Sequence, residues 1–138
     1  MDDIARLGSV ERAALFTETA ARRGIARAVI VEKDFWVCWT LHRLFALQAA
    51  RPEEHPGLVF KGGTSLSKAF RLIERFSEDI DLTLDWRGLG FTGERDPADA
   101  ASRRRRDTLR GELASACERY IASTLLPALR SDFTTVHR

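Results

Sequence analysis

The sequence predicts an α/β or α+β domain in which a small sheet lies among helices. Two segments with helical periodicity open the chain, two strand-like segments with a helix between them follow, and a long helical segment comes last. Two or three strands among four helices are typical of this class. The chain has 138 residues, of which 44% are apolar. That is enough for one hydrophobic core and too little for two ordinary domains, so we expect a single domain over residues 1–138.

Residues 1–56 are predicted to form the N-terminal helices. Ser9 is a candidate cap for a helix that ends at Gly24, since serine favours helix starts and glycine favours helix ends. A longer helix is expected from Arg27 to Ala50, where apolar and aromatic residues recur at steps of three and four. Its apolar stripe is wide, which indicates a largely buried helix. Pro52 closes it.

Residues 57–85 are predicted to form the centre of the domain. The segment from Gly57 to Phe60 has the character of a short buried strand, and Gly62 and Gly63 form a turn. A helix is expected from Thr64 to about Arg75. The segment from Ser77 to Asp85 alternates between polar and apolar residues, which predicts a second strand.

The remaining chain is predicted to be a loop and one long helix. Three glycines in the segment from Trp86 to Asp96 indicate a loop, and the long helix is expected within residues 97–130. Pro127 is expected to end or kink this helix. Residues from Asp132 to Arg138 have the character of a strand that begins there.

Composition argues against several classes of protein. No apolar run approaches the roughly 20 residues of a membrane helix, and the acidic start of the chain does not resemble a signal peptide. We therefore expect a cytoplasmic protein with no membrane partner. Cys38 and Cys117 are expected to be buried free thiols, and the histidines lack zinc-ligand spacing. The net charge of +2 does not by itself indicate a nucleic-acid partner.

The predicted turn at Gly62 and Gly63 has features of an anion-binding site. A strand leads directly into two glycines and a helix start, where backbone N–H groups and the helix dipole favour phosphate. Thr64 and Ser65 can add hydroxyl donors, and Lys68 can add positive charge. The spacing differs from that of a Walker loop. Two glycines before a helix are, taken alone, more often only a turn.

Asp79 and Asp81 are the candidate metal ligands. Residues two apart on a strand point to the same side, so these two carboxylates are expected to lie side by side. A hard divalent cation would remove their mutual repulsion and use both as oxygen ligands. A solvated strand face is the ordinary alternative. A metal pair beside a phosphate site is more specific and suits nucleotidyl transfer.

The segments Lys61–Lys68 (KGGTSLSK) and Arg75–Leu82 (RFSEDIDL), with Val31–Val37 upstream, resemble the signature of the AbiEii/AbiGii-type nucleotidyltransferase toxins. That family belongs to the DNA polymerase β-like nucleotidyltransferase superfamily. The resemblance implies a nucleotidyltransferase-like small mixed sheet flanked by helices. It also implies the toxin component of a type IV toxin–antitoxin or phage-exclusion system, with a cognate antitoxin. Such a toxin would transfer a nucleoside monophosphate from a triphosphate to an acceptor such as tRNA or another RNA.

The resemblance also implies roles for individual residues. Gly62, Gly63 and Ser65 would hold the triphosphate, and Lys68 would contact phosphate or support the loop. Asp79 and Asp81 would bind Mg²⁺, or Mn²⁺ in its place. Family members are longer, with a further acidic residue and a later lysine in the site. We therefore expect this chain to correspond to the N-terminal part of a longer family protein.

Two alternatives stay open beside the transferase. The first is a truncated, catalytically inactive relative that binds a nucleotide or a protein partner. The second, which the motifs disfavour, is an interaction domain with a solvated acidic strand. Asp132 is a candidate for the missing acid, although no pattern around it supports that role. The run Arg103–Arg106 is either a contact for RNA phosphates or a solvated helix face.

Overall fold

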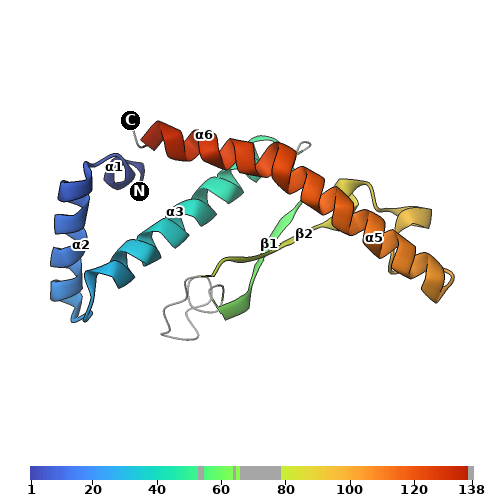
Figure 1. The fold of residues 1–138 in the computed structure, drawn as a ribbon, viewed down its shortest axis with the longest axis horizontal. Coiled ribbons are helices and arrows are strands. Elements are labelled where there is room, and N and C mark those ends of the chain that lie inside the picture. The colour runs from blue at the N-terminus through green and yellow to red at the C-terminus, as the bar shows by residue number, and fades with distance from the viewer. Residues whose placement is uncertain (53–54, 64, 66–78, 137–138) are drawn as a thin grey trace. The chain divides into compact units, whose positions relative to one another are not determined.

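The computed structural model describes residues 1–52, 55–63, 65 and 79–136 (Figure 1). It is mostly helical, with one two-stranded antiparallel sheet in the described part, which confirms the predicted α+β class. The chain forms two compact units. The first unit contains Met1–Leu44, Phe60–Asp81 and Asp132–Arg138, and the second contains Phe45–Val59 and Leu82–Ser131.

The N-terminal helices lie close to the predicted bounds. They are α1 (Asp2–Ala5), α2 (Ser9–Arg23) and α3 (Ala28–Ala50). Gly24 ends α2 in the left-handed conformation, with φ of 65°. Ser9 is not the cap, because it already lies inside the helix. Gly8 is the N-cap residue, and its N–H donates to the Glu11 carboxylate at 3.3 Å.

Aromatic residues form the core of the first unit. Trp39 is fully buried together with Ala5 and Val136, and Phe133 packs on Trp39 with ring centroids 4.7 Å apart. Phe133 and Val136 belong to α6 (Leu126–Val136), so the strand predicted from Asp132 is wrong over its described residues. Residues three apart lie on one face of a helix, which lets both side chains reach this core.

A charged network joins α1, α3 and α6 at the edge of this core. The Arg43 guanidinium binds the Asp132 carboxylate through two contacts of 2.6 and 2.9 Å and lies 3.7 Å from Asp2. Asp2 also accepts a hydrogen bond of 2.9 Å from the Trp39 indole. This hydrogen bond is the main cause that lowers the pKa of Asp2. Pairing with Asp132 raises the pKa of Arg43.

Two short strands form the sheet, β1 (Leu58–Lys61) and β2 (Asp81–Leu84). The Asp85 N–H donates to the Gly57 carbonyl at 2.7 Å, which sets the antiparallel register. The strand predicted from Ser77 is shorter than expected, since Asp79 and Ile80 precede β2 and residues 77–78 lie outside the described part.

The second unit continues through two 3₁₀ turns, η1 (Trp86–Leu89) and η2 (Gly93–Arg95), in place of the predicted loop. The helix α5 (Arg103–Tyr120) begins six residues later than Pro97, because the Ser102 hydroxyl caps it by accepting from the Arg105 N–H at 3.1 Å.

Pro127 does not end the helical segment, because α6 continues past it, so of the two predicted effects, an end or a kink, the end is wrong. A π-helical segment, η3 (Ile121–Leu125), joins α5 to α6, and the Leu126 N–H donates to the Ile121 carbonyl. Pro127 is the second residue of α6. Proline lacks the N–H that would continue the helical ladder, and the π-helical segment directly before it is where the hydrogen-bond pattern shifts to i→i−5.

The second unit buries the large side chains of Leu109, Phe91 and Tyr120. Tyr120 shares a buried hydrogen bond of 2.8 Å with Nδ1 of His55, and burial raises the pKa of Tyr120. Cys38 and Cys117 are free, as predicted, but only partly buried. Of the helices described, none combines the length and apolar character needed to cross a membrane.

Candidate functional site

The end of β1 and the start of β2 bring Gly62 and Asp81 into contact. Gly62 follows β1 with φ of 72°, a left-handed conformation that favours glycine. A Cβ added at Gly62 would overlap the Asp81 carboxylate, because it would lie 2.8 Å from Cγ and 3.0 Å from Cβ of Asp81. Glycine is therefore required here on two grounds, and the carboxylate rests directly on the backbone of the turn.

The turn leads into a helical segment that begins at Gly62 and includes Gly63 and Ser65. Ser65 is buried, with 5% of its surface exposed, and its hydroxyl donates to the Gly62 carbonyl at 2.9 Å. This hydrogen bond holds the turn closed. In this conformation the Ser65 hydroxyl proton is therefore committed to the backbone, and the residue supports the shape of the turn.

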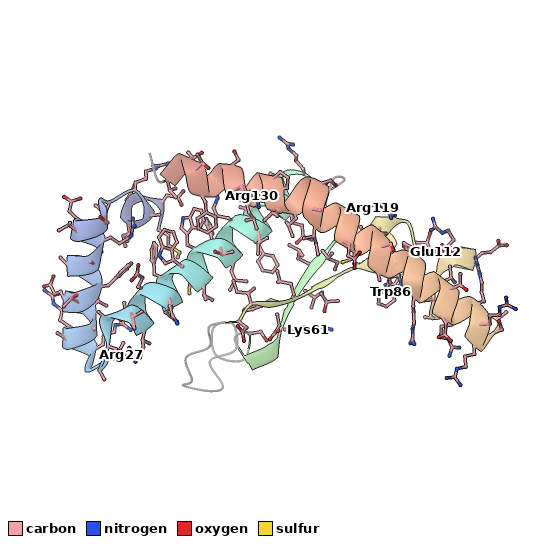
Figure 2. All side chains as sticks on the ribbon, viewed as in Figure 1. Arg27, Lys61, Trp86, Glu112, Arg119 and Arg130 are labelled. Carbon is pink, nitrogen blue, oxygen red and sulfur yellow. The ribbon has the colours of Figure 1, made fainter. Side chains whose placement is uncertain are left out.

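Asp79 and Asp81 are both exposed, and the Ile80 side chain between them is half-buried. This alternation agrees with the expectation that the two carboxylates point to the same side, although β2 itself begins only at Asp81. No described residue donates a hydrogen bond or a positive charge to Asp81. Lys61 is exposed at the end of β1 (Figure 2).

Two of the predicted site residues, Thr64 and Lys68, lie outside the described residues, as does most of the helix predicted from Thr64 to Arg75. Asp132 does not complete a metal site. It pairs with Arg43, and within residues 1–52, 55–63, 65 and 79–136 no three His, Cys, Asp or Glu side chains gather as metal ligands would.

The arrangement suits a divalent cation together with a phosphate. A turn that leads into a helix start attracts anions, whereas a carboxylate lying on that turn repels them. A hard cation bound to the carboxylate resolves the conflict, because it takes both carboxylate and phosphate oxygens as ligands. Exposed oxygen donors on Asp79 and Asp81 fit Mg²⁺, which binds through one or two carboxylates plus substrate phosphates.

Comparison with known proteins gives a match to a family model. A family model described as "Nucleotidyl transferase AbiEii toxin, Type IV TA system" matches residues 44–135, which is more than half of the chain. The matched segment contains Gly62, Gly63, Asp79 and Asp81. No curated protein matches the chain, and no solved structure does.

Proposed function

Because the chain belongs to the AbiEii family of nucleotidyltransferase toxins of type IV toxin–antitoxin systems, we propose that it is a magnesium-dependent nucleotidyltransferase. It moves a nucleoside monophosphate from a nucleoside triphosphate to an acceptor such as tRNA or another RNA, and a cognate antitoxin opposes it. The contact between Gly62 and Asp81 is the observation that supports the proposal most, since it joins the anion-binding turn to a metal-binding carboxylate.

Each residue of the candidate site has a part in this reaction. Gly62 and Gly63 let the triphosphate approach the backbone, and Ser65 keeps the turn closed. Asp79 and Asp81 would hold Mg²⁺, whose charge would stabilise the negative charge on the phosphate oxygens. Thr64 and Lys68 are proposed as further phosphate contacts.

The transfer itself is a displacement at phosphorus. The acceptor hydroxyl oxygen attacks the α-phosphorus, and the bond from that phosphorus to the oxygen bridging the β-phosphate breaks. Pyrophosphate leaves with the electron pair, and the hydroxyl proton passes to water. Negative charge develops on the non-bridging and leaving oxygens, where positive charge is most useful.

A second candidate function is binding of a nucleotide without transfer. One observation favours it: among the described residues no third carboxylate joins Asp79 and Asp81. Incubation with total RNA and a nucleoside triphosphate labelled on the α-phosphate separates the candidates, because label enters RNA only if transfer occurs.

Isothermal titration calorimetry with each ribonucleoside triphosphate, with and without Mg²⁺, tests the site itself. We expect binding that needs Mg²⁺ and is lost in the Asp79→Asn/Asp81→Asn variant. Asp99→Asn is the control, because it removes an exposed loop carboxylate elsewhere in the chain. Magnesium-independent binding, or binding unchanged in the double variant, would show that these carboxylates hold no metal.

A further inference from the structure

A cavity of about 490 Å³ lies in the second unit, between α5 and the segment before it. Its walls are Trp86, Pro97, Ala98, Arg106, Arg110 and Leu113. The last three share one face of α5, because they are spaced by four and three residues. Figure 2 shows Trp86 beside α5. The volume lies within the range of roughly 300–1,000 Å³ that is usual for small-molecule sites.

Two of the lining residues carry positive charge that no described side chain neutralises. Nearby arginines have partners: Arg95 pairs with Glu112 at 3.2 Å, and Arg103 lies 3.9 Å from Asp107. Arg106 and Arg110 are exposed, and in the described part of the chain neither guanidinium has an ion pair or hydrogen bond.

This pair of arginines has no evident role in folding. Like charges four residues apart on a helix repel each other weakly. Arg106, in the first turn of α5, also opposes the helix dipole. The arrangement is therefore mildly unfavourable to the helix, and an anion bound between the two guanidinium groups would reverse that effect.

The opposite wall of the cavity is aromatic and apolar. Trp86 is half-buried, and the Arg87 guanidinium lies 5.1 Å from its ring centroid. The indole Nε1–H of Trp86 is buried and finds no acceptor among the described residues. A buried donor without an acceptor is costly, so an acceptor from outside the chain would be favourable here. Pro97 is buried and belongs to this apolar wall, while half-buried Leu113 adds an apolar side chain to the α5 wall.

An apolar aromatic wall opposite two guanidinium groups matches the chemistry of a nucleotide. Arginine binds phosphate through a planar fork of donors, and bases pack on tryptophan faces. Arg103 lies three residues before Arg106 on the same face of α5, so it extends the positive surface beyond the two lining arginines. A positive surface longer than one phosphate favours a nucleic-acid strand over a free nucleotide as the ligand.

We propose that this cavity binds a nucleotide within a single-stranded nucleic acid, with phosphate at Arg106 and Arg110 and a base beside Trp86. This binding goes beyond the proposed function, because a single-stranded nucleic acid can be bound without any nucleotidyl transfer. An acidic peptide is the competing ligand for such a surface. It lacks the planar base that the aromatic wall would hold.

The expected effect follows from counterion release. Each phosphate neutralised by a single-strand-binding protein contributes a slope of about −0.7 to log affinity against log salt concentration. The Arg106→Gln/Arg110→Gln variant should therefore lose about 1.4 of that slope. Over the tenfold interval from 1 M to 0.1 M salt, a slope change of about 1.4 corresponds to roughly 25-fold weaker binding at 0.1 M salt. Trp86→Phe keeps the aromatic ring and removes the N–H, so a smaller loss is expected.

Fluorescence anisotropy of short labelled single-stranded RNA and DNA, titrated with the full chain at several salt concentrations, measures these values. Arg23→Gln/Arg27→Gln is the matched control, since it removes two exposed arginines of the first unit. Circular dichroism establishes that each variant is folded. If the Asp79→Asn/Asp81→Asn variant still bound the oligonucleotides, this site would be distinct from the proposed transfer site.

Three results would overturn the proposal. One is the absence of oligonucleotide binding by the folded chain. Another is an equal loss in the control and in Arg106→Gln/Arg110→Gln, which would indicate only general attraction to positive charge. The third is a polyglutamate probe that binds as tightly as the oligonucleotide and is equally sensitive to the same two arginines and to Trp86→Phe.

Discussion

Gly62→Ala is expected to lower stability slightly and to weaken magnesium-dependent nucleotide binding strongly. Alanine in a left-handed conformation costs about 1–2 kcal/mol, while its smaller unfolded-state entropy returns about 0.4–1 kcal/mol. The net loss is therefore about 1 kcal/mol. Rotation of the exposed Asp81 side chain takes its carboxylate away from the added methyl group, but Cβ of Asp81 stays 3.0 Å away, so a shift of the turn by a few tenths of an ångström adds a modest further loss.

That rotation takes the carboxylate off the turn, so binding should suffer more than folding. Displacing groups that orient metal ligands costs roughly 10–100-fold in metal affinity, and a loss of this size is expected for the Mg²⁺–triphosphate complex. Calorimetric titration measures the affinity. Chemical denaturation measures the free energy of unfolding.

Gly24→Ala is the matched control for this experiment. Gly24 has a φ of 65°, close to the 72° of Gly62, but a Cβ there would meet nothing within 4 Å. The two variants should therefore lose similar stability, and only Gly62→Ala should lose binding. Unchanged binding by a folded Gly62→Ala protein would refute the role given to the Gly62–Asp81 contact.

Three further predictions concern the folded framework. Asp132→Asn should lower the free energy of unfolding by about 1.5–3 kcal/mol, since it breaks a charged pair with Arg43, and urea denaturation tests this. The hydrogen bond from the Trp39 indole lowers the pKa of Asp2 below the ordinary value of 3.8. The stability that the ionised Asp2 contributes is therefore present above pH 3.8 and is lost as pH falls below that value. Asp2→Asn should flatten that acid dependence of the melting temperature. Burial raises the pKa of Tyr120 above the ordinary value of 10.0. The stability that its protonated side chain contributes is therefore present below pH 10.0 and is lost as pH rises through the folded-state pKa. Tyr120→Phe should remove that alkaline loss, as melting curves would show.

Local signals predicted the helices of the first unit well. The end of α2 follows from Gly24, and α3 follows from its repeated apolar residues, because both signals act within a few residues. The segment from Asp132 misled the prediction since Phe133, two threonines and Val136 favour strands by intrinsic preference. Packing of Phe133 on Trp39 outweighs that preference, and this contact is distant in sequence.

The residues of the candidate site could be named from the sequence, but the contact between Gly62 and Asp81 could not be predicted from it. Gly62 and Asp81 meet because of the register between β1 and β2, and nothing local fixes that register. The metal and nucleotide roles of Asp79, Asp81, Thr64 and Lys68 stay predictions. The cavity beside Trp86 was missed for a similar reason, since Arg106 and Arg110 lie about twenty residues away in sequence.

The small net charge of +2 conceals two local charge patterns of opposite sign. Asp79 and Asp81 need a cation before they can face a phosphate, whereas Arg106 and Arg110 can bind a phosphate directly. Magnesium and salt should therefore affect the two sites differently. Chelation of Mg²⁺ should abolish triphosphate binding and leave oligonucleotide binding intact, while added salt should weaken oligonucleotide binding with a slope set by a few arginines. If chelation abolished both, one shared site would explain the data better than two.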